Sequence, residues 1–234
     1  MLPANSKALL FDLDGTLIDS MPHHHNAWVR WHERRGLSID GERFFAETAG
    51  RSNAEILADM LPALSVAEHT AMADEKEALY RELASVSLAL IGGAAEFVTA
   101  AHRAGFKLAV CTASTPQNMA LAFERHGIDA WVETVVSPAD RAFGGGPADL
   151  LRGKPHPDIF LEAARRLGIA PADCIVFEDA PLGIEAARRA GMPAVALTTT
   201  MTADAFAAFD NVLKIAPDFT TLHPHLLTKA APHA

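Results

Sequence analysis

Residues 9–20 read LLFDLDGTLIDS, and this stretch decides the fold. The apolar run ending at Phe11 predicts a buried strand, and Gly15 lets the chain turn sharply away from it. Side chains two residues apart on a strand point to the same side, so Asp12 and Asp14 converge at the strand end. Two carboxylates that close need a cation, a shared proton or an anionic ligand with its metal. The stretch predicts a chemical site, with two solvated aspartates in a turn as the alternative.

The composition limits the domain count and the partners. A chain of 234 residues, half of them apolar, can form one sizeable core with a smaller companion unit. The formal charge of −9 argues against nucleic acid or an anionic membrane as partner. Residues 1–7 carry no apolar signal-peptide core, so we expect a cytoplasmic protein. Cys111 and Cys174 lie in apolar runs and are predicted to be buried, reduced thiols.

The second half of the chain alternates helix and strand patterns. Apolar runs predict strands at 107–111, 134–137, 174–177 and 194–197, and helices are predicted at 92–104, 116–126, 157–167 and 182–190. Nearly all-apolar strands separated by helices indicate a parallel sheet covered on both faces. We therefore predict an α/β fold, a doubly wound, Rossmann-like parallel sheet.

Nearly ninety residues separate the first strand from the next, whereas a parallel crossover needs about a dozen. The segment between them has helical patterns throughout, with capping boxes beginning at Ser52 and Ser65. We predict an all-helical cap domain at 20–88 inserted into a core domain made of 1–19 and 89–234.

Parallel α/β sheets bind ligands outside the carboxyl ends of their strands. Polar segments follow three of the predicted strands, and a lysine between a glycine and a proline precedes the helix at 157–167. The candidate residues are Asp12, Asp14, Thr112, Ala113 through its backbone amide, Ser114, Lys154, Glu178 and Asp179. Each has a structural alternative: Thr112 and Ser114 as helix caps, Lys154 as a solvated charge, and the acidic pair as a cap of the next helix. Four such groups at one sheet edge favour a site.

The order and type of these motifs resemble those of the haloacid dehalogenase-like (HAD) hydrolases, most of which are phosphatases. The resemblance covers essentially the whole chain. It rests on three motifs, Asp-x-Asp-Gly-Thr at 12–16, Gly-Lys-Pro at 153–155 and Phe-Glu-Asp-Ala at 177–180. The helical insert stands where subfamily I of this family has its cap, and the cap sequence is similar to the β-phosphoglucomutase-like and sugar-phosphatase branch.

The resemblance implies a role for each motif residue. Asp12 is expected to be the nucleophile that forms an aspartyl-phosphate, and Asp14 the general acid and base. Lys154 is expected to balance charge, with Thr112, Ala113 and Ser114 binding phosphate oxygens. The expected cofactor is Mg²⁺, held by a set consisting of Asp12, the Asp14 backbone carbonyl, Asp179 and Glu178.

The cap supplies two further candidates for substrate binding. His24 matches a histidine that interacts with the acid/base aspartate in the β-phosphoglucomutase-like branch, and Arg51 lies in a Gly-Arg-Ser segment like the branch's specificity loop. The alternatives are a solvated helix start, or a transition-metal site, for the adjacent histidines 23–25, and a surface position for Arg51. Adjacent helical side chains point apart, which argues against one ion bound by all three histidines.

Two departures from the mutase pattern favour hydrolysis. The β-phosphoglucomutases carry basic residues where this chain has Asn53 and Thr115, so a second phosphate lacks its cations. We therefore expect a phosphatase acting on a small phosphomonoester such as a sugar or polyol phosphate, with a phosphosugar mutase as the alternative. A catalytically silent binding protein is a further alternative, disfavoured by the intact motifs; a dehalogenase is disfavoured by the intact Asp14 and acidic pair.

We expect a monomer, with a dimer as the alternative. The glycine-rich stretch 141–147 is interpreted as a surface insertion or a flap near the site.

Overall fold

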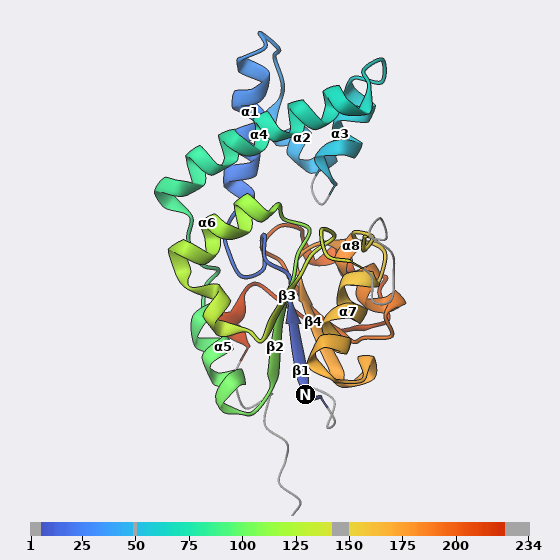
Figure 1. The fold of residues 1–234 in the computed structure, drawn as a ribbon. Helices are drawn as coiled ribbons and strands as arrows, with labels where there is room; N and C mark the ends of the chain where they lie inside the picture. The colour runs from blue at the N-terminus through green and yellow to red at the C-terminus, as the bar shows by residue number, and fades with distance from the viewer. Residues whose placement is uncertain (1–5, 49–50, 142–149, 223–234) are drawn as a thin grey trace, which may run out of the picture. The chain divides into compact units, whose positions relative to one another are not determined.

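The structure, a computed structural model, describes residues 6–48, 51–141 and 150–222. The chain divides into two compact units (Figure 1). The core unit comprises Met1–Asp19 and Leu90–Ala234, and the helical unit comprises Ser20–Ala89. The second boundary falls one residue later than the one predicted from the sequence. The glycine-rich stretch lies, apart from Arg141, outside the described residues.

The core unit is built on a six-stranded parallel sheet in the order β3-β2-β1-β4-β5-β6. The strands are β1 (Ala8–Phe11), β2 (Lys107–Cys111), β3 (Thr134–Val136), β4 (Cys174–Glu178), β5 (Ala194–Leu197) and β6 (Val212–Ala216). The first five confirm the prediction. The sixth was missed because it is an edge strand whose Leu213 and Ile215 stay exposed, so it lacks the fully apolar pattern of the others.

Helices cover both faces of this sheet. They are α5 (Ala94–Arg103), α6 (Pro116–His126), α7 (Asp158–Leu167) and α8 (Pro181–Arg189). Alternate side chains of β1 point to opposite faces. Leu10 packs in a cluster with Phe160 of α7 and Ile184 of α8, whereas Phe11 stacks on Phe177, with ring centroids 4.9 Å apart, beside Phe97 of α5. The doubly wound arrangement predicted from the apolar strands is therefore confirmed.

The two cysteines lie in this core. Cys111 on β2 and Cys174 on β4 are free and buried, as predicted. Burial raises the pKa of both thiols, that of Cys174 to about 12, so neither forms a reactive thiolate near neutral pH.

The helical unit contains α1 (Met21–Glu33), α2 (Gly41–Thr48), α3 (Asn53–Met60) and α4 (Val66–Ser87). Both predicted capping boxes are present: Ser52 pairs with Glu55, and Ser65 with Glu68. Trp31 of α1 and Tyr80 of α4 are fully buried. Among the described residues, no helix combines the length and apolar character needed to cross a membrane.

Candidate active site

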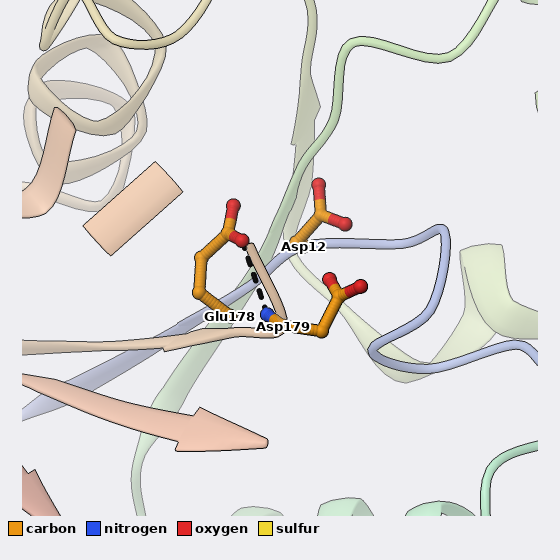
Figure 2. A group of neighbouring side chains, drawn as sticks. All are labelled: Asp12, Glu178 and Asp179. Atoms are coloured by element: carbon orange, nitrogen blue, oxygen red, sulfur yellow. Dashed lines mark hydrogen bonds between the residues drawn. The ribbon is translucent and has the colours of Figure 1, made fainter. Parts of the chain in front are cut away.

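Two neighbouring strands bring three carboxyl groups together. β1 pairs with β4 so that Phe11 lies opposite Phe177, and the residues that follow are Asp12 on one strand and Glu178 and Asp179 on the other. One oxygen from each carboxylate lies within 4.8 Å of the other two, and all three residues are buried. Figure 2 shows the carboxyl groups gathered beyond the ends of β1 and β4. The sheet-edge rule thus placed the acidic groups correctly.

Lys154 enters this cluster from the segment before α7. Its ammonium group pairs with Asp12 and, at 2.5 Å, with Glu178, and only 11% of its side chain is exposed. Burial alone would lower the pKa of Lys154, but the two carboxylates outweigh it and raise the pKa, which keeps the ammonium charged. The alternative of a solvated surface lysine is therefore wrong.

Glu178 is fixed by the start of α8. Its Oε2 accepts the backbone N–H groups of Asp179 and Ala180, both at 3.1 Å. A Cβ at position 183 would lie 1.9 Å from the Glu178 Cδ, so Gly183 leaves the space that this carboxylate occupies. Glu178 thus contacts the helix start, as its alternative reading proposed, and also holds Lys154.

Asp179 is supported by the turn after β1. Thr16, fully buried, donates a hydrogen bond of 2.9 Å to Asp179 Oδ1. Gly15 has a φ of +76°, and a Cβ there would lie 2.2 Å from Asp179 Oδ2. This glycine therefore serves both the left-handed turn and the close approach of the carboxylate. Half-buried Asp14 lies in the same turn, and its charge contributes to the raised pKa of Asp12.

The site carries more negative charge than its lysine balances. Burial raises the pKa of Asp12, and Glu178, Asp179 and Asp14 add to the rise, against the opposing effect of Lys154. Burial and the Glu178 charge raise the pKa of Asp179 to about 7, although the Thr200 and Thr16 hydroxyls and Lys154 act in the opposite direction. Buried carboxylate oxygens in excess of nearby cations are the donor set that a hard divalent ion prefers. The residues present therefore fit a divalent metal ion.

Thr112 and Ser114, in the segment after β2, do not cap the helix that follows it. Thr112 is buried, and its Oγ1 accepts the N–H of Ser114 at 2.9 Å. The cap of α6 is Thr115, whose side chain accepts the N–H of Asn118. The alternative of Thr112 and Ser114 as helix caps is thus wrong. Their function as phosphate ligands, with Ala113, stays a prediction.

In the helical unit, His24 belongs to a polar cluster that sequence reasoning missed. Lys76 Nζ lies 2.7 Å from His24 Nδ1 and 2.9 Å from Glu77 Oε1, and Asn53 donates to Glu77 at 2.6 Å. Burial alone would raise the pKa of Glu77, but Lys76, His24 and Asn53 lower it to about 2. Lys76 and Glu77 are buried although they lie in a charged, alanine-rich stretch that is typical of a solvated helix face.

The other candidates of the helical unit have separate partners. His23 contacts Ser87, and His25 stacks on Phe45, so the three adjacent histidines turn to different neighbours, as expected. Arg51 pairs with Asp59 at 2.5 Å on the surface of the unit, which agrees with its alternative reading as a surface residue. Contact of His24 or Arg51 with a substrate stays a prediction, and Gly50 lies outside the described residues.

The raised pKa of Asp179 predicts how pH and metal change stability. Because its folded pKa lies above the ordinary value of 3.8, the folded protein holds this proton more tightly, and stability falls as pH rises from about 4 to 7. In metal-free protein at pH 8, Asp179→Asn should therefore raise the thermal midpoint by several degrees, because a neutral side chain replaces a buried charge. Between pH 5 and 8, the wild-type midpoint should fall relative to that of the variant.

Saturating Mg²⁺ at pH 8 should raise the midpoint of the wild type by several degrees and leave Asp179→Asn nearly unchanged. Differential scanning calorimetry with and without chelator measures both effects. Asp173→Asn, at the opposite end of β4, is the matched control and should respond to Mg²⁺ like the wild type. A midpoint of Asp179→Asn below that of the wild type at pH 8 would contradict the prediction.

The fold and motifs have close counterparts among known proteins. Residues 6–191 match the family described as haloacid dehalogenase-like hydrolase. The chain is 35% identical over 225 residues to validoxylamine A 7'-phosphate phosphatase of Streptomyces hygroscopicus subsp. limoneus, with 94% of this chain and 98% of that protein covered. It is 33% identical to hexitol phosphatase A of Escherichia coli, with 82% of each covered, and 29% identical to β-phosphoglucomutase of Bacillus subtilis, with 81% of this chain and 82% of that one covered.

The family match spans most of the chain, and it includes Asp12, Lys154, Glu178 and Asp179. The parallel sheet and the acidic cluster agree with it. The chain therefore belongs to the haloacid dehalogenase-like hydrolase family, in its sugar-phosphatase and β-phosphoglucomutase branch.

Proposed function

We propose that the protein is a Mg²⁺-dependent phosphatase that hydrolyses a small sugar or polyol phosphate through an aspartyl-phosphate. The observation that carries the proposal is the buried cluster of Asp12, Glu178 and Asp179 with Lys154 at the carboxyl edge of the sheet. The two similar phosphatases support the substrate class, since their names specify a validoxylamine phosphate and hexitols.

The proposed chemistry gives each motif residue a role. An Asp12 oxygen attacks phosphorus while the bond to the alcohol oxygen breaks, and Asp14 gives its proton to that oxygen. Water then attacks the aspartyl-phosphate, Asp14 accepts its proton, and inorganic phosphate leaves. Lys154 offsets negative charge throughout, and Thr112 with the Ala113 and Ser114 segment binds the phosphate oxygens.

The proposed ligands of Mg²⁺ are the Asp12 and Asp179 carboxylates and the Asp14 backbone carbonyl, with Glu178 close by. When bound, the ion neutralises charge between the carboxylates and the phosphate and so permits their approach. Burial raises the pKa of both Asp12 and Asp179, so a bound cation would favour their ionised, metal-binding forms.

The residues at the two positions where the mutases carry cations favour a phosphatase over a mutase. Asn53 stands where β-phosphoglucomutases have a basic residue, and it hydrogen-bonds Glu77. Thr115, at the second such position, is the N-cap of α6. The buried Lys76 of the same unit is paired with Glu77, and Arg51 with Asp59. None of these residues offers an unbalanced charge to a second phosphate, so water is the favoured acceptor.

His24 and Arg51 are proposed to contact the alcohol part of the substrate.

The decisive experiment measures phosphate release from a panel of hexitol, pentitol and sugar monophosphates, with Mg²⁺ and with chelator. We expect Mg²⁺-dependent release from at least one member. A parallel reaction contains β-glucose 1-phosphate with a trace of its 1,6-bisphosphate. Conversion to glucose 6-phosphate without phosphate release would contradict the proposal and identify a mutase, and a lack of turnover in both assays would favour a binding protein.

The remaining proposals concern the partner, the location and the oligomeric state of the enzyme. The partner is a phosphorylated small molecule, and the net charge of −9 argues against nucleic acid. A cytoplasmic location and a monomeric state, with a dimer as the alternative, stay predictions.

A further inference from the structure

Three consecutive threonines, Thr198, Thr199 and Thr200, follow β5 at the same edge of the sheet as the acidic cluster. β5 pairs with β4, with Ala196 opposite Glu178. The threonine segment therefore begins beside the strand end that carries Asp179.

Thr199 is bonded to the turn after the first strand. Its Oγ1 donates a hydrogen bond of 2.5 Å to the backbone carbonyl of Gly15, which lies 184 positions away in the sequence. The Gly15 N–H in turn donates to the Ile18 carbonyl at 2.9 Å. The peptide units before and after Gly15 are thus each held by one hydrogen bond, and the Asp14 carbonyl belongs to the first of these units.

Thr200 also lies beside Gly15, next to Asp179. A Cβ on Gly15 would lie 2.6 Å from Thr200 Oγ1 and 2.2 Å from Asp179 Oδ2, so the hydroxyl and the carboxylate share one small space beside the glycine. The Thr200 hydroxyl oxygen is buried and makes no hydrogen bond of standard geometry among the described residues, which leaves it able to turn toward Asp179. Thr16 already donates to Asp179 Oδ1, so hydroxyl groups from two separate segments flank this carboxylate.

We propose that Thr199 and Thr200 are positioning residues that hold the turn at Asp14 and the Asp179 carboxylate in the arrangement needed to bind a divalent cation. The inference rests on the metal-dependent function proposed above. Outer hydrogen-bond partners of metal ligands commonly change metal affinity, because they fix the orientation of the ligating oxygens. The two threonines act through Gly15 and Asp179.

The test compares Mg²⁺ binding without substrate, by isothermal titration calorimetry, in the wild type, Thr199→Val and Thr200→Val. Valine keeps the shape of threonine and replaces the hydroxyl by a methyl group. We expect the dissociation constant for Mg²⁺ to rise about tenfold or more in each valine variant. Thr199→Ser and Thr200→Ser keep the hydroxyl and should bind Mg²⁺ within about threefold of the wild type.

Thr198→Val is the matched control, because Thr198 belongs to the same segment and is held there by its backbone N–H, which donates to Ala216. It should bind Mg²⁺ like the wild type. If a valine variant does not fold, Thr199→Ala and Thr200→Ala repeat the test without adding a methyl group where the hydroxyl lies. The electron paramagnetic resonance signal of Mn²⁺ gives a second, independent measure of binding.

Two results are decisive against the inference, and they differ in meaning. Equal Mg²⁺ affinities in the wild type and both valine variants would overturn the inference alone. A wild-type protein that binds no divalent cation would overturn the metal-dependent function and the inference together.

Discussion

Replacing Asp12 by Asn should lower the rate of phosphate release by at least about 10⁴-fold, because the amide keeps the shape of the side chain but is not a nucleophile. The folded state should survive the change. Burial raises the pKa of Asp12, so the ionised carboxylate is unfavourable in the folded protein at neutral pH, and the neutral amide avoids this cost. Lys154 retains Glu178 as its partner. We therefore expect a thermal midpoint equal to or above that of the wild type.

Steady-state assays with the best substrate of the panel, together with calorimetry, measure both effects. Asp173→Asn makes the same chemical change at the amino end of β4, where the side chain pairs with Lys7, and should keep activity within about twofold. Turnover of Asp12→Asn within tenfold of the wild type would exclude Asp12 as the nucleophile. Because Asp12→Asn is expected to stay folded, a loss of activity cannot be attributed to unfolding.

Replacing Lys154 by Met should reduce both activity and stability. The substitution removes the cation that contacts Asp12 and Glu178 and leaves buried carboxylates without it. Breaking a buried pair from one side costs about 3–5 kcal/mol, which corresponds to roughly 6–20 °C in a chain of this length. The rate should fall by about 10²–10³-fold or more, since a charge that stabilises the transferring phosphate is lost.

The pH dependence of this variant separates electrostatics from packing. Without Lys154 the pKa of Asp12 should rise further, so the deficit in stability should shrink as pH falls toward 5 and the carboxyl groups become protonated. Arg152→Met is the matched control, because it removes an exposed cation two residues away that pairs with Asp158. It should retain activity within about threefold. A Lys154→Met deficit that is the same at pH 5 and pH 8 would contradict the electrostatic explanation.

The sequence by itself determined the elements of the core and the edge at which the site lies. Apolar runs, glycines after helices and two capping boxes are local signals, and they predicted five strands and the helices around them to within a few residues. The edge rule for parallel sheets then gathered Asp12, Lys154 and the acidic pair without any distance information, because parallel strands all end at the same edge.

The tertiary structure decided which of those groups touch and which neighbours support them. The contact between Thr199 and Gly15 joins residues 184 positions apart, and that of Lys154 with Asp12 joins residues 142 apart; both depend on strand register and loop path. The threonines after β5 follow a strand at the same edge of the sheet as the acidic pair. Their position in the sequence could therefore have identified them as candidate site residues. Three threonines after a strand are also typical of an ordinary loop. Only the hydrogen bond from Thr199 to Gly15 distinguishes a segment that supports the site from such a loop.

The sequence also could not predict which charged side chains are buried. The pair Lys76 and Glu77 lies in a polar stretch that predicts a solvated helix face, yet both side chains are buried beside His24. Helical periodicity records which positions are apolar, whereas a buried ion pair is stabilised by partners on other helices that no local pattern encodes. Short-range rules thus fixed the elements and their common edge, and the packing of distant segments decided the charge balance and the hydrogen bonds of the site.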